Sequence, residues 1–157
     1  MANYIGPTGW SLDGAVLQTV QAATYISGEV SIANGASYNF PTIAITPKSS
    51  ASSLIYVSAP RFYSRATDRP SNTYLNTLIY IDEAGAGSTK MHEWINYADN
   101  YSTTDGLRLS YPVIYNYANN STSTRTFNTR AYNAAPGSNT GRIAGEYMYS
   151  QYIMEME

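Results

Sequence analysis

The sequence predicts an all-β protein, an antiparallel β-sandwich or jelly roll of about eight strands. Aromatic residues make up 13% of the chain, with 16 tyrosines, and aromatic and β-branched residues favour strands. Runs of such residues recur at regular spacing, separated by Gly, Pro, Asn and Ser, which favour turns. No segment shows the periodicity of an amphipathic helix. The 157 residues suit one domain, which we place at 15–157 after an extended N-terminal arm at 1–14.

The turn chemistry divides the domain into strands. Asn34-Gly35 is a strong hairpin signal. Pro41 and Pro112 each interrupt a strand-like run. Because proline cannot donate to a ladder, we expect a bulge or an edge position at Pro41 and an edge position or a bend at Pro112. Residues 90–96 form a short run of ambiguous pattern. The expected strands are, in chain order, 15–26, 29–33, 38–46, 53–62, 74–83, 107–117, 122–132 and 142–154.

Three of these strands predict their surroundings. Strand 53–62 is apolar on both faces, which is typical of a central strand. Strand 122–132 alternates polar groups around Phe127, which is typical of a surface strand. Strand 142–154 carries large apolar or amphipathic side chains on both faces. Because a monomeric sandwich buries only one face of a strand, the second face predicts contact with another subunit.

Composition excludes several classes of function. The chain has 9 basic and 11 acidic residues, so it lacks the basic footprint of a nucleic-acid-binding protein. It has no cysteine and one histidine, His92, which excludes disulfides, thiolate catalysis and a multi-histidine metal site. No run approaches the ~20 apolar residues of a membrane span, and Met1–Pro7 lacks the pattern of a secretory signal. We therefore expect a protein made in a cytoplasm, with no nucleic-acid or membrane partner.

The sequence predicts no enzyme, no cofactor and no metal. His92 and Glu93 are adjacent on a strand-like run, so they point to opposite faces and cannot act together. No G-x-S-x-G motif exposes a serine nucleophile. The carboxylate pairs Asp82/Glu83 and Asp99/Asp105 resemble solvated loop charges, and nothing marks either as a glycosidase dyad.

Tyrosine-rich segments are the best functional hint, and they allow two interpretations. Tyrosine favours protein–protein contacts because it is large and amphipathic, and it also stacks on sugars. Subunit packing is the favoured interpretation, and the arm either folds an aromatic residue onto the core or reaches a neighbouring subunit. The predicted subunit or virion contacts are Tyr4, Trp10, Tyr147, Met148, Tyr149, Tyr152 and Met154. The alternative is a glycan site on the loops 63–73 and 97–106, formed by Tyr63, Arg65, Asp68, Arg69, Tyr97, Asn100 and Tyr101.

Three segments carry a resemblance to a known family. They are 14–22 (GAVLQTVQA), 43–50 (IAITPKSS) and 53–57 (SLIYV). Together they resemble a module of tailed-phage virion proteins, cyanophages among them, that reads LQVVQA, then ITP, then SSKILV. The resemblance covers about a third of the chain, and the lysine of SSK is missing here. It implies a non-enzymatic virion component, usually a homotrimer.

Taken with the resemblance, these observations predict a homotrimeric capsid decoration or cement protein that stabilises the shell. Its partners are then further copies of itself and the major capsid protein or other virion proteins, and its place is the virion surface, on the capsid exterior or the tail. The alternative is a tail-fibre or receptor-binding module that recognises a host-surface glycan. The chain has no shaft, repeat or heptad run of the kind a self-sufficient fibre needs, which favours the first interpretation.

Overall fold

The computed structural model of the chain describes residues 15–64, 73–81, 89–98, 107–110, 112–133, 141–143 and 145–157. Within these ranges the chain forms thirteen strands and no helix, which confirms the all-β prediction and raises the strand count above the expected eight. No helix of these residues is long and apolar enough to cross a membrane. The predicted arm at 1–14 lies outside the described residues.

The strands form three antiparallel sheets. The first sheet has the order β1 (Val16–Ile26), β13 (Tyr147–Met156), β5 (Ser53–Ser58) and β10 (Val113–Ala118). The second has the order β3 (Ser37–Asn39), β11 (Arg125–Asn133), β7 (Thr73–Ile81) and β8 (Thr89–Ala98), with β4 (Ile43–Ile45) also paired to β11. The third has the order β2 (Val30–Ile32), β12 (Gly141–Ile143), β6 (Arg61–Ser64) and β9 (Leu107–Ser110).

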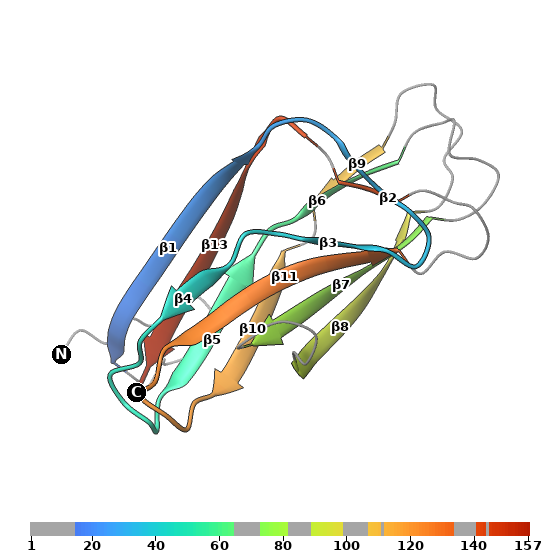
Figure 1. Cartoon of the computed structure of the whole chain (residues 1–157). Coiled ribbons are helices and arrows are strands. Elements are labelled where there is room, and N and C mark those ends of the chain that lie inside the picture. The colour runs from blue at the N-terminus through green and yellow to red at the C-terminus, as the bar shows by residue number, and fades with distance from the viewer. Residues whose placement is uncertain are drawn as a thin grey trace, which may run out of the picture.

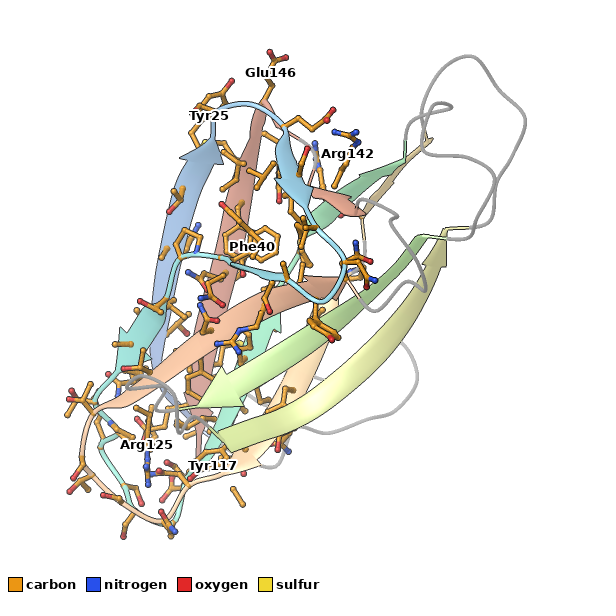
Figure 2. The ribbon with its side chains drawn as sticks, turned by 45° about the vertical axis from the view of Figure 1, so that its right-hand side comes forward. Tyr25, Phe40, Tyr117, Arg125, Arg142 and Glu146 are labelled. Carbon is orange, nitrogen blue, oxygen red and sulfur yellow. The ribbon has the colours of Figure 1, made fainter. Side chains whose placement is uncertain are left out.

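The first and second sheets pack face to face as a sandwich, as Figure 1 shows. Their inner faces bury one apolar cluster, in which Ile45 of β4, Leu54 and Tyr56 of β5, and Phe127 of β11 are at most 2% exposed. The Tyr56 and Phe127 rings stack at 5.2 Å between centroids. A second cluster lies toward the third sheet. In it Phe40 (Figure 2) stacks on the buried Tyr149 of β13. These two clusters are the core of the domain.

Each strand of the first sheet continues into a strand of the third, in the same order. β1, β13, β5 and β10 correspond to β2, β12, β6 and β9, so the third sheet is the bent continuation of the first. The bend falls at residues that interrupt a ladder: Pro60, Pro112, Gly28 with a φ of 107°, and Gly145 followed by Glu146 with a φ of 57°.

This bend explains three incorrect strand predictions. The expected strands 53–62, 107–117 and 142–154 are each two strands, split between the first and third sheets. Alternation continues through such a corner, so periodicity alone does not detect it. The bend expected at Pro112 is confirmed. The central position expected for 53–62 holds for β5, which lies between β13 and β10.

The turn predicted at Asn34-Gly35 is confirmed, but the hairpin expected there is wrong, because β2 pairs with β12 and β3 pairs with β11. Asn34-Gly35 forms a turn in which Ala36 N donates to Ala33 O at 3.0 Å, and Gly35 has a φ of 74°. Pro41 separates β3 from β4. Both strands pair with β11 alone among the described strands, which confirms an edge position at this proline.

Two other predictions were wrong. Strand 122–132 was expected at the surface, but β11 is an inner strand of the second sheet, and its Phe127, Thr129 and Ala131 are fully buried. Residues 90–96, whose pattern was ambiguous, belong to the ten-residue strand β8. Tyr63 and Tyr97 were expected in loops and lie instead in β6 and β8.

Candidate functional site

The outward face of the first sheet carries no charged residue. Its members alternate along each strand with residues that pack into the core. We call this surface the contact face. Its residues are Thr19, Gln21, Ala23 and Tyr25 on β1, Met148, Ser150, Tyr152 and Met154 on β13, Ser53, Ile55 and Val57 on β5, and Ile114, Asn116 and Ala118 on β10.

Apolar side chains occupy the middle of the contact face. Tyr152 lies opposite Val57, and Val57 lies opposite Ile114, so this row crosses three strands. In the next row Met154 lies opposite Ile55. Ile114 is 63% exposed and Tyr152 37%. Residues directly opposite one another on neighbouring strands have Cβ atoms about 5 Å apart, so these rows form a continuous apolar strip.

Polar or small residues flank this strip. Gln21 and Thr19 on β1 lie opposite Tyr152 and Met154, and Asn116 on β10 lies opposite Ile55. The Gln21 amide donates to the Tyr152 hydroxyl at 3.4 Å. An apolar centre within a polar, uncharged rim is typical of a protein–protein interface.

A second apolar pair lies at one end of the contact face. β5 pairs with β13 only from Gln151 onward, so residues 147–150 of β13 pair with β1 alone among the described strands. On this two-stranded ribbon Tyr25 lies opposite Met148, and they are 56% and 55% exposed. Figure 2 shows Tyr25 at the end of the ribbon, near Glu146. The ribbon therefore carries an exposed apolar tip.

The inward face of β13 corrects part of the predicted contact set. Tyr147 and Tyr149 are 4% and 0% exposed and belong to the core of the domain, so they are wrong as subunit contacts. Burial raises the pKa of Tyr147 to about 12 and also raises the pKa of Tyr149, so both phenols stay protonated. Met148 and Tyr152 are exposed, and Met154 is half-buried.

A buried hydroxyl network connects the two large sheets. The Tyr56 hydroxyl of β5 lies 2.7 Å from Thr129 Oγ1 of β11 and donates to Gln151 Oε1 of β13 at 3.0 Å. Ser58 Oγ is 2.8 Å from the same Thr129 atom, and Tyr149 OH lies 3.3 Å from Tyr56 OH. Burial raises the pKa of Tyr56. Mutual hydrogen bonding explains how polar residues of β11 lie inside the sandwich.

The sequence interpretation missed a buried carboxylate. Glu155 is 0% exposed and accepts hydrogen bonds from Lys48 N at 2.9 and 3.0 Å, from Ser49 N at 3.0 Å and from Gln18 Nε2 at 2.7 Å. Burial alone would raise the pKa of Glu155, but these hydrogen bonds outweigh it and hold that pKa below its usual value.

Glu155 therefore fixes the turn between β4 and β5, which contains the Thr46-Pro47-Lys48-Ser49 segment of the phage-like motif. The alternation of β13 was the available signal, because it places Glu155 on the same inward face as Ile153. The motif thus has a structural role here: it supplies the backbone N–H groups that bind this carboxylate.

Seven of the predicted site residues lie outside the described residues. They are Tyr4, Trp10, Arg65, Asp68, Arg69, Asn100 and Tyr101. His92 and Glu93 are consecutive in β8, opposite Ile79 and Leu78. Within the described part of the chain, no group of three or more His, Asp or Glu side chains could hold a metal ion.

Comparisons with known proteins do not identify a family. No family model matches the sequence, and no curated protein sequence matches it. The fold is similar to a chain in the "Structure of infectious bursal disease virus Gx strain", with a TM-score of 0.45 and 10% sequence identity. The match covers 100% of this chain and 42% of that chain, so this chain spans less than half the length of its neighbour.

Proposed function

We propose that this protein is a non-enzymatic structural component of a tailed-phage virion, a homotrimer that decorates the capsid and stabilises the shell. The observation that carries the proposal is the contact face, a four-stranded sheet surface with an apolar centre and no charge. The tailed-phage resemblance of residues 14–22, 43–50 and 53–57 supplies the biological setting.

The exposure of this face favours a protein that works by binding other proteins. Ile114, Met148 and Tyr25 are each more than half exposed, and all three lie on one sheet surface. Soluble monomers rarely expose contiguous apolar surface of this kind without a partner. Aromatic and methionine side chains are enriched at the centres of interfaces, where charged residues are depleted.

The buried polar groups favour a structural role over catalysis. Glu155 is held by backbone amides and the Gln18 side chain, and the Tyr56 hydroxyl joins the two sheets. Both are enclosed in the core, with hydrogen bonds that connect elements of the fold. Their hydrogen bonds therefore support the sandwich itself. The glycan-binding alternative uses the segments 63–73 and 97–106, of which 65–72 and 99–106 lie outside the described residues.

The direct test is immunogold electron microscopy of purified phage particles with an antibody against this protein. We expect label over the whole shell. Particles without label would refute the virion role, and label restricted to the tail would refute capsid decoration and favour the receptor-binding alternative.

A second experiment tests the predicted arm. Deleting residues 1–12 is expected to leave a folded protein with the circular dichroism spectrum and melting temperature of the full chain. This truncated protein should no longer bind phage particles from which the full-length protein is absent. Full occupancy of such particles by the truncated protein would show that the arm is not the anchor.

A further inference from the structure

We infer that the contact face packs against the same face of two further copies around a three-fold axis, with the axis running along β13 and β5. The inference deepens the proposed function and rests on its homotrimer, because it names the surface and the residues that join the subunits. Its core is the apolar strip formed by Tyr152, Val57, Ile114, Met154 and Ile55.

The chemistry of the face favours a second copy of this chain as the occupant. Interfaces with a different protein commonly use complementary charge for steering and specificity, and none of the contact-face residues is charged. Around a symmetry axis each residue near the axis meets its own copies, so any charge there would face the same charge. An uncharged strip avoids this repulsion in every copy.

The size of the face suits a stable assembly only when most of it is used. Its strands have 11, 10, 6 and 6 residues. With a rise of about 3.3 Å per residue and a strand spacing of about 4.8 Å, the flat area is about 500 Å². A three-fold assembly divides this face between two neighbours, about 250 Å² of flat area for each, whereas stable interfaces bury about 800 Å² of accessible surface per partner. Protruding side chains enlarge the accessible area, but a contact that used one edge alone would fall far below this value.

The distribution of side chains places the axis. β13 and β5 are the two middle strands of the sheet, and they carry four of the five residues of the strip. The outer strand β10 adds Ile114 beside Val57, and the outer strands also contribute Gln21 and Asn116, which can hydrogen-bond at the margin or stay hydrated. An axis parallel to the middle strands therefore buries the apolar residues most deeply and leaves the amides at the rim, as in other protein interfaces.

The first test compares Val57→Asp with Ala44→Asp by light scattering at micromolar concentration. The wild-type protein is expected at three times 17.2 kDa, or about 52 kDa. Val57→Asp, at the centre of the strip, should shift the mass to 17.2 kDa, because three buried carboxylates would meet near the axis. Ala44 is exposed on β4 of the other large sheet, and its Asp variant should keep the wild-type mass.

The second test does not require an introduced charge and so keeps the inference testable if Val57→Asp fails to fold. The chain has no cysteine, which makes Ser150→Cys on the contact face and the matched Ser37→Cys on β3 clean probes. Three cysteines at a three-fold axis can form one disulfide per trimer. Mild oxidation should therefore cross-link about two thirds of the Ser150→Cys chains into dimers on a denaturing gel, while the native mass stays trimeric.

Each other outcome has a definite meaning. Complete cross-linking with a native mass of two chains would replace the three-fold packing with a face-to-face dimer. Absence of cross-linking in Ser150→Cys, together with a trimeric Val57→Asp, would move the interface away from the contact face while leaving the virion role to the antibody labelling. A monomeric wild-type protein would refute both this packing and the homotrimer.

Discussion

Replacing Glu155 with Gln tests whether this buried carboxylate holds the turn between β4 and β5. The substitution preserves size, and one amide oxygen can still accept from Lys48 N or Ser49 N. Its amide nitrogen, however, would face Gln18 Nε2, which lies 2.7 Å from the present carboxylate, so a donor would meet a donor. Hydrogen bonds to a charged group contribute about 1.5–3 kcal/mol each. We expect the free energy of unfolding to fall by about 2–4 kcal/mol, from one lost bond and the weakening of the others.

The pH dependence gives this prediction its sign. Because the pKa of Glu155 in the folded protein lies below its usual value, the carboxylate contributes its full stabilisation above the pKa of the unfolded chain, about 4.3. That contribution is lost as the pH falls through the folded-state pKa. The stability difference between wild type and Glu155→Gln should therefore be largest near pH 7 and shrink toward pH 3.

Urea unfolding at several pH values measures both effects. Gln18→Ala is the matched control, because it keeps the charge and removes the Gln18 hydrogen bonds to Glu155 Oε2 and Thr46 O, and it should cost about 1–2 kcal/mol. A change of less than 0.5 kcal/mol in Glu155→Gln, on the order of a neutral surface substitution, would refute the reasoning. A difference that does not vary with pH would show that the charge of Glu155 is not what holds the turn.

Two further substitutions test the corner and the hydroxyl network, both by urea unfolding. Gly145→Ala places a Cβ in the main chain of Gly28 and should lower the free energy of unfolding by at least about 2–3 kcal/mol. Gly35→Ala is the control, because it has open space and only backbone strain at its φ of 74°, and it should lower the free energy of unfolding by about 1–2 kcal/mol. Equal losses would contradict the close approach at the corner. Tyr56→Phe removes the hydroxyl that bonds to Gln151 Oε1 and Thr129 Oγ1 and should lower the free energy of unfolding by about 1–3 kcal/mol. The exposed Tyr152→Phe is the control and should change it by less than about 0.5 kcal/mol. No change in Tyr56→Phe would show that the network does not join the sheets.

Local sequence was sufficient to predict the turns and breaks whose conformation depends only on residues next to them in the chain. The turn at Asn34-Gly35 follows from the conformational freedom of Gly35, and the split at Pro41 follows from its missing N–H. The alternation of β13 separated exposed Met148 and Tyr152 from the residues between them. It did not decide which face was the core, and for that reason Tyr147 and Tyr149 were assigned to contacts.

The errors came from features that depend on distant residues. β11 resembles a surface strand because Thr129 is polar, but its hydroxyl meets Tyr56 and Ser58 of another sheet, and no local pattern reveals a partner more than 70 positions away. The corner that divides three predicted strands requires four strands to bend at one level. Pro60 and Gly145 signal a break locally, but only the assembled sheets show that the halves belong to different layers.

The position of β13 has a consequence for protein synthesis. It is the last described strand to leave the ribosome, yet it lies between β1 and β5, and it supplies Glu155 to the turn that β5 follows. Until residues 147–156 have been synthesised, β1 has no neighbour in its sheet, and its backbone N–H and C=O groups stay unpaired. Such long-range pairing slows folding and exposes strands to aggregation during translation. A prematurely terminated chain would lack a middle strand of its first sheet and would leave β1 without its neighbour.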